Sequence, residues 1–236
     1  MPEHTLKRFD TELDELNNLI KSMFKIVRKN IKQALQALIE GNTELAKTVI
    51  KHDESANALE VQSDEAARNL IVHHQPAASD LRFVFAATKI VTDLERMSDM
   101  AANIADNVLN IEGATPKNLG SIPVMQDLVF DQLKAVRHAY LERSATKAQA
   151  IIERDHRINE AFANTQRVML TVMAERPAKI TQCLAIINIA KVMERIGDHI
   201  TNIAEMVIYT DVGHEVRHID REELRRLLAE EGDDDD

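Results

Sequence analysis

Two similar acidic motifs, one early and one late in the chain, carry the side chains best suited to chemistry. The first begins Glu95-Arg96-Met97-Ser98-Asp99 and the second begins Glu194-Arg195-Ile196-Gly197-Asp198. On a helix, carboxylates four residues apart lie on the same face. Oxygen ligands of this kind suit hard or borderline cations such as Mg²⁺, Mn²⁺, Ca²⁺ and Fe, and less typically Zn²⁺. The motifs therefore predict either two metal sites or two solvated acidic faces.

Further carboxylates and amides extend both motifs. The candidate metal ligands on the motif helices are Glu95, Asp99, Asn103, Asp106, Glu194, Asp198, Asn202 and Glu205. The preceding helices add Asp53, Asn57, Asp155 and Asn159. The match is imperfect, because the second copy has Phe162 and Gln166 where the first has Glu60 and Asp64. We expect each half to gather ligands from two neighbouring helices, with the motif acids on a concave or partner-facing surface.

The residues alone leave the choice between metal sites and solvated faces open. Like charges at this spacing repel each other, and a partly buried group of them ionises with difficulty unless a cation lies among them. The acids also interrupt a stripe that is otherwise apolar or small, unlike an ordinary solvated face. Against this, Arg96 and Arg195, together with nearby lysines, could neutralise the acids at the surface.

The repeated motifs belong to a larger internal duplication. Asp53 and Asn57 correspond to Asp155 and Asn159, and a proline precedes each motif helix, Pro76 or Pro177. Apolar residues recur at helical spacing throughout, and the chain has 3% aromatic residues and no Trp, a composition that favours helix. We predict an all-α fold of two tandem, similar three-helix bundles, with six long helices in total.

Glycines, prolines and charge set the expected domain boundaries. The first bundle should cover residues 1–112, a linker rich in Gly and Pro residues 113–123, and the second bundle residues 124–212. Residues 213–236 should form a C-terminal extension whose acidic tail is disordered.

Composition excludes several classes of protein. No apolar run is long enough to span a membrane, and the first residues lack the apolar core of a signal peptide. The one cysteine, Cys183, lies in an apolar helical stretch, which together with the missing signal favours the cytoplasm. The net charge is −10, and an acidic chain without basic stripes is a poor nucleic-acid binder.

Catalysis is not expected, although one enzymatic alternative stands. The chain has no glycine-rich phosphate loop and no spacing of a catalytic triad, so a dedicated phosphate pocket is not expected either. A carboxylate-bridged di-iron enzyme or iron store needs Glu-x-x-His motifs on a bundle. Two such motifs exist, Glu153 with His156 and Glu215 with His218, but both lie off the acidic stripe. A purely structural adaptor is a third possibility, and it would tolerate neutral substitution of the acids.

The motifs resemble those of the PhoU family, the phosphate-transport accessory and regulatory proteins of bacteria. The resemblance rests on three segments: Gln75-Pro76-Ala77-Ala78-Ser79-Asp80-Leu81-Arg82, Asp93-Leu94-Glu95-Arg96-Met97-Ser98-Asp99, and Glu194-Arg195-Ile196-Gly197-Asp198-His199 with Asn202-Ile203-Ala204-Glu205. It covers about residues 8 to 210. Ser98 departs from the second copy, which has Gly197, and we expect it to leave the carboxylates undisturbed.

The resemblance implies a cytoplasmic, non-enzymatic and usually dimeric protein that acts through partners. Members of this family mediate between a phosphate ABC transporter ATPase and a sensor histidine kinase, and they keep the phosphate regulon off when phosphate is plentiful. The membrane would be reached only through those partners. The resemblance further implies metal at Glu95, Asp99, Glu194 and Asp198, with iron or zinc as the reported types. Mn and Mg also suit these ligands, and the sequence does not identify the metal.

Overall fold

The fold is entirely helical over the part of the chain that can be described. A computed structural model describes residues 3–111, 117–216, 219 and 222–227, and these residues contain no strand. Seven α-helices and one 3₁₀-helix are arranged along them, and residues 222–227 form a further short helical segment. This confirms the predicted all-α class. Residue 112, at the expected end of the first bundle, residues 113–116 of the expected linker and residues 228–236 of the expected acidic tail lie outside the described part.

The first half is a bundle of three long helices: α1 (Glu3–Glu40), α2 (Thr43–His74) and α3 (Ala78–Leu109). Gly41 adopts a φ of 65° between α1 and α2, a conformation that glycine takes without steric cost. Asn42 then caps α2, because its side-chain oxygen accepts a hydrogen bond from the backbone N–H of Leu45 at 3.0 Å. Gly41 and Asn42 together therefore end α1 and begin α2.

The second half repeats the plan with one difference. Its elements are α4 (Ile122–Glu142), α5 (Ala145–Ile152), α6 (His156–Glu175), the 3₁₀-helix η1 (Pro177–Lys179) and α7 (Ile180–Val212). We expected six long helices, but the second helix of this half is divided into α5 and α6. Between them the backbone N–H groups of Arg154 and Arg157 bond to carbonyls three residues earlier, and His156 Nδ1 hydrogen-bonds the Glu153 carbonyl at 3.0 Å. Tight turns and a side chain that binds the backbone therefore replace α-helical bonds here.

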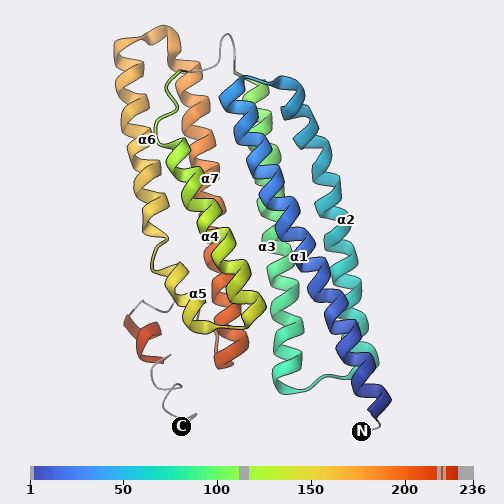
Figure 1. The fold of residues 1–236 in the computed structure, drawn as a ribbon. Helices are drawn as coiled ribbons and strands as arrows, with labels where there is room; N and C mark the ends of the chain where they lie inside the picture. The colour runs from blue at the N-terminus through green and yellow to red at the C-terminus, as the bar shows by residue number, and fades with distance from the viewer. Residues whose placement is uncertain (1–2, 112–116, 217–218, 220–221, 228–236) are drawn as a thin grey trace.

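The two bundles lie side by side and join along α3 and α7 (Figure 1). These two helices run in opposite directions, and α1 and α4 make a second, smaller contact between the halves. Both helices carry a buried apolar stripe: Ile90, Leu94 and Met97 of α3, and Ile189, Met193 and Ile196 of α7, have no exposed surface. Each acidic motif is therefore built on a helix whose other side is fixed in the core.

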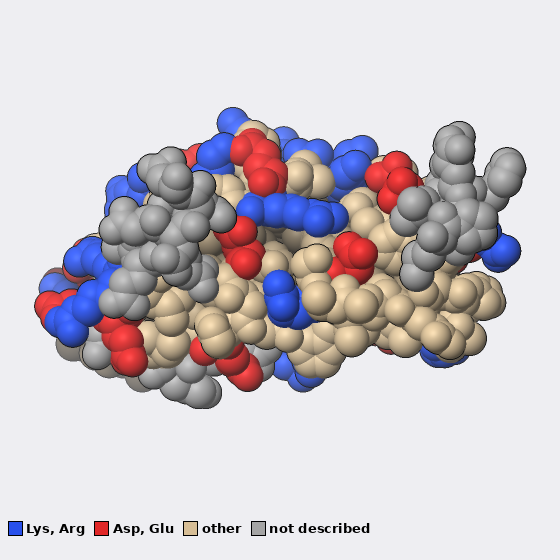
Figure 2. Space-filling view, turned by 90° about the horizontal axis from the view of Figure 1, so that it is seen from below, with Lys and Arg blue, Asp and Glu red and all other residues tan. Residues whose placement is uncertain are grey.

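The surface carries charges of both signs. In the view from below, acidic and basic side chains are interspersed among uncharged ones (Figure 2). Within the described residues, none of the helices combines the length and hydropathy that a bilayer crossing requires.

Candidate functional site: two acidic helix faces

Four carboxylates from two helices form the first acidic group, which we define as Asp53, Glu60, Glu95 and Asp99. Asp53 and Glu60 belong to α2, and Glu95 and Asp99 to α3. They influence one another, because Asp99 raises the pKa of Asp53, Glu60 and Glu95. Burial is the largest cause of the raised pKa in all three, and for Glu60 the charge of Asp64 also contributes more than that of Asp99. A group of carboxylates that repel each other favours protons or a cation.

Ser98 holds one member of this group in place. Its hydroxyl donates to Asp53 Oδ1 at 2.8 Å and accepts from Asn30 Nδ2 at 3.0 Å. Asn30 and Ser98 are both buried, so the chain from Asn30 through Ser98 to Asp53 joins all three helices of the first half. We expected Ser98 to leave the carboxylates undisturbed; instead it orients Asp53 and opposes the rise in its pKa.

The first acidic group should make stability depend on pH. Burial, then the charges of Asp99, Glu60 and Asp53, raise the pKa of Glu95 from 4.5 to about 7. A raised pKa in the folded state means that the folded protein binds this proton more tightly than the unfolded chain. The stability that Glu95 contributes is therefore present below about pH 4.5 and is lost as pH rises through about 7.

We expect Glu95→Gln to lose less stability than the wild type between about pH 5 and pH 8, measured by urea unfolding in the presence of a chelator. Parallel pH profiles for the two proteins would contradict this expectation. Replacing the chelator with Mg²⁺ or Mn²⁺ at the high-pH end should stabilise the wild type more than the variant, because a cation that binds only the folded state adds stability by mass action.

The second acidic group, Asp155, Glu194 and Asp198, is more neutralised than the first. Lys191 Nζ lies 2.7 Å from Glu194 Oε2, whereas the first half has Thr92 at the corresponding place, three residues before Glu95. Burial, then Glu194 and Asp155, raise the pKa of Asp198, and Lys191 opposes this rise. The two faces are therefore unequal, and the first retains the larger unbalanced negative charge.

The remaining predicted ligands bond to other residues or are at least partly exposed. Asn202 Nδ2 donates to Asp93 Oδ1 at 3.4 Å across the junction between the halves. Asp106 Oδ2 accepts from Asn110 and Asn103 Oδ1 accepts from Asn107, each within its own helix. Asn57 and Asn159 are exposed, and Glu205 is half-buried. The structure thus brings together the acids nearest the motif starts, and not the amides.

Metal binding stays a prediction. Oxygen donors with raised pKa values have the right chemistry for a hard cation in the first acidic group. The geometry is less complete, because no group of three or more His, Cys, Asp or Glu side chains within the described residues is arranged to hold a metal ion. The carboxylate of Asp99 lies close enough to Asp53 and Glu95 to raise the pKa of each, so these three side chains would be the first ligands of a cation there.

The motifs of the di-iron alternative are engaged elsewhere. Glu153 Oε1 accepts from Arg225 Nε at 2.7 Å, and His156 binds the Glu153 backbone. His218 lies outside the described residues. This arrangement does not favour a di-iron centre over the described part of the chain.

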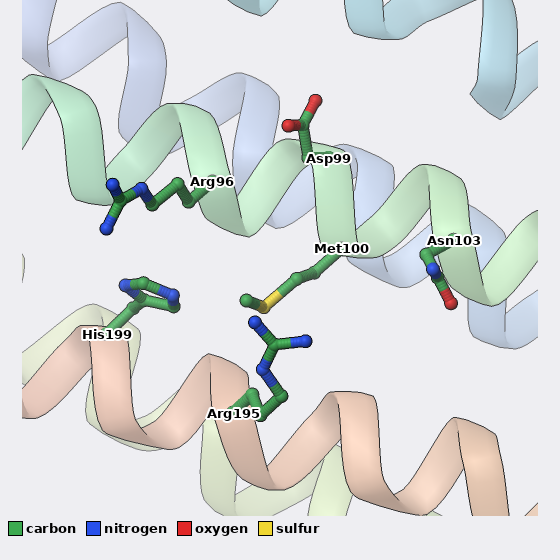
Figure 3. Close-up of a pocket in the computed structure, with 6 residues that line it drawn as sticks. All are labelled: Arg96, Asp99, Met100, Asn103, Arg195 and His199. Carbon is green, nitrogen blue, oxygen red and sulfur yellow. The ribbon is translucent and has the colours of Figure 1, made fainter.

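The sequence did not indicate a buried polar link between the two halves. His199 Nδ1 of α7 forms a 2.7 Å hydrogen bond with Asp93 Oδ1 of α3, and both residues are buried. Beside this link, a cavity of about 330 Å³ opens between α3 and α7 (Figure 3). Its lining residues are Arg96, Asp99, Met100, Asn103, Arg195 and His199. The only signal in the sequence is Asp93, an acid next to Leu94 on the approach to the first motif, and the second copy has Val192 at that place; neither indicates the partner of Asp93.

Fold and site together define a helical protein of two duplicated bundles whose faces are suited to binding. The PhoU domain profile matches residues 20–108 and 122–207, and the chain belongs to the PhoU family. It is 38% identical over 230 residues to the "Phosphate-specific transport system accessory protein PhoU homolog" of Zymomonas mobilis, covering 97% of this chain and 96% of that protein. It is 31% identical to "Phosphate-specific transport system accessory protein PhoU" of Escherichia coli K12, covering 96% and 95%.

Solved structures show the same fold. The crystal structure of PhoU from Pseudomonas aeruginosa matches with a TM-score of 0.82 and 32% identity, over 87% of this chain and 100% of that one. The phosphate transport system regulatory protein PhoU from Streptococcus pneumoniae matches with a TM-score of 0.82 and 28% identity, over 88% and 99%. These two solved structures thus share the fold of this chain.

Proposed function

We propose that this protein is a negative regulator of the phosphate regulon and a modulator of phosphate uptake. It would link the ATPase of a phosphate ABC transporter to a sensor histidine kinase, acting in the cytoplasm as a homodimer and by binding rather than catalysis. The observation that carries the proposal is similarity over nearly the whole chain to proteins named as phosphate transport accessory proteins. Long helices with unequal acidic faces are well suited to docking on partner proteins.

The first acidic group is our candidate for the functional surface. Its carboxylates lie on α2 and α3, away from the buried stripe of α3, and Asp99 is exposed. We propose that it binds a divalent or trivalent cation, for which Asp53, Glu95 and Asp99 would supply oxygen ligands and which would neutralise their mutual repulsion. The second acidic group should bind more weakly, because Lys191 already pairs with Glu194.

The regulatory role can be tested in cells. A deletion strain carrying E95Q/D99N should express phosphate-starvation genes in high phosphate, whereas the wild-type gene should restore repression. Both substitutions keep the shape of the side chains and remove their charge, so the fold should persist. The readout is a phosphate-starvation reporter, with protein abundance measured in parallel.

The matched control is D10N/D14N. Asp10 and Asp14 are also four residues apart on one helix, α1, and both are exposed. This variant removes two charges at the same spacing from a different surface and should repress normally. Full repression by E95Q/D99N would show that the first acidic group is not functional. Equal derepression by both variants would show that only total charge matters.

A further inference from the structure

The cavity between α3 and α7 is positively lined, although the protein as a whole is acidic. It combines the guanidinium groups of Arg96 and Arg195 with the imidazole of His199. Figure 3 shows Arg96 extending from α3 and Arg195 from α7 into the space between the two helices. Asp99 is the one carboxylate in the lining, and its side chain turns away from the arginines.

The two arginines occupy equivalent positions of the duplicated motif, each directly after the glutamate. Because α3 and α7 lie antiparallel along the junction, the duplication brings one arginine from each half to the same cavity. Within the described residues, neither guanidinium has a hydrogen bond or ion pair, although the charge of Arg96 slightly opposes the rise in the pKa of Glu60. Two unpaired guanidinium groups beside one cavity are stabilised by an anion between them.

The acids near the cavity do not serve as that anion. The carboxylate of Asp93 is already hydrogen-bonded to His199, with Asn202 as a second donor. Asp99 contributes to the first acidic group, where it raises the pKa of Glu95. The two guanidinium groups therefore face the open space, whereas Asp93 is occupied by His199 and Asp99 turns toward the first acidic group.

Although the sequence predicted no dedicated phosphate pocket, we propose that this cavity binds a small free tetrahedral oxyanion of the phosphate class. Guanidinium groups bind such oxyanions through paired, charge-assisted hydrogen bonds. The volume of about 330 Å³ accommodates an ion of a few heavy atoms together with several waters, since one water occupies about 30 Å³ of liquid. A bound anion would contact both halves of the chain at once. The inference goes beyond the proposed function, because regulation through protein contacts requires no small ligand.

The test uses the purified full chain with a chelator present, so that metal binding does not contribute. Inorganic phosphate, sulfate and a dicarboxylate are titrated at constant ionic strength by calorimetry. Phosphate and sulfate should bind saturably, and both R96Q and R195Q should weaken phosphate binding by about tenfold or more, the usual effect of losing a charged hydrogen bond. Circular dichroism checks that each variant is folded, as expected for exposed side chains.

The matched control is R167Q. Arg167 is an exposed arginine on α6 and does not line this cavity, so its loss should leave phosphate affinity unchanged. No saturable binding of phosphate or sulfate by the wild type would overturn the proposal. So would affinities that fall equally in R96Q, R195Q and R167Q, which indicate a general charge effect. Tighter binding of the dicarboxylate than of phosphate would also overturn it and point to a carboxylate of a docked partner. These outcomes are independent of the reporter experiment, which measures gene expression and not ligand affinity.

Discussion

Replacing His199 with leucine should destabilise the protein by about 3–5 kcal/mol, the usual cost of leaving a buried charge without its partner. Asp93 is only 8% exposed, and without His199 its carboxylate keeps Asn202 as a weak donor at 3.4 Å. A buried carboxylate without adequate hydrogen bonds has a high free-energy cost. Urea unfolding followed by circular dichroism measures the free energy of unfolding of wild type and variant.

The control is the double variant D93L/H199L. Because an apolar pair needs no hydrogen bonds, the double variant should recover much of the stability that the single variant loses. The comparison separates the loss of a hydrogen-bonded partner from the loss of packing at position 199. A single variant within about 1 kcal/mol of the wild type, the range of a surface ion pair, would show that the Asp93–His199 link does not stabilise the junction.

Much of the fold could be predicted because its signals are local. Apolar residues at helical spacing predicted the helices, and Pro76 and Pro177 lie just before the two motif helices α3 and α7, as the duplication predicted. The break between α5 and α6 could not be predicted in the same way. It depends on one histidine binding a backbone carbonyl and on a few tight turns, and none of these interrupts the apolar spacing.

Part of the first acidic group could also be predicted from the sequence, because its signals are local too. Helical spacing placed Glu95 and Asp99 on one face, and the duplication suggested Asp53 on the neighbouring helix. The role of Ser98 was misjudged because its bond to Asp53 depends on how closely α2 and α3 approach. At the equivalent position in α7, an added Cβ on Gly197 would lie 2.9 Å from Ile158 Cδ1. The approach of the neighbouring helix therefore leaves room for a serine in the first half but only for a glycine in the second.

The junction between the halves could not be predicted from either repeat alone. A duplication specifies each bundle but not how two bundles meet. The pairing of Asp93 with His199, and the shared cavity of Arg96 and Arg195, depend on the register of α3 against α7. In each case one partner comes from each copy at positions that are distant in sequence. Residues that act across the junction are therefore visible only in three dimensions.

Tyr140 makes the other main connection between the halves, at the contact of α4 with the first bundle. Its hydroxyl donates to Asn17 Oδ1 of α1 at 2.7 Å, and its ring stacks on Phe83 of α3 with 5.9 Å between centroids. Phe24 of α1 lies against the same ring, and Arg143 covers the ring of Phe83 at 4.2 Å. Tyr140 is 4% exposed, so one side chain of the second half is enclosed by residues of the first.

Tyr140→Ala should therefore cost about 3–5 kcal/mol, the usual loss for a large aromatic residue in a core. Tyr140→Phe should cost only about 1 kcal/mol, because it keeps the ring and loses one hydrogen bond. Calorimetry of both variants measures the cost and also the cooperativity. Since Tyr140 packs across the junction, the wild type should unfold in one transition and Tyr140→Ala should broaden or divide it. Equal losses of stability in the two variants would mean that the hydroxyl and not the ring holds the halves together. A wild type that already unfolds in two steps would mean that the two bundles are stable independently of this contact.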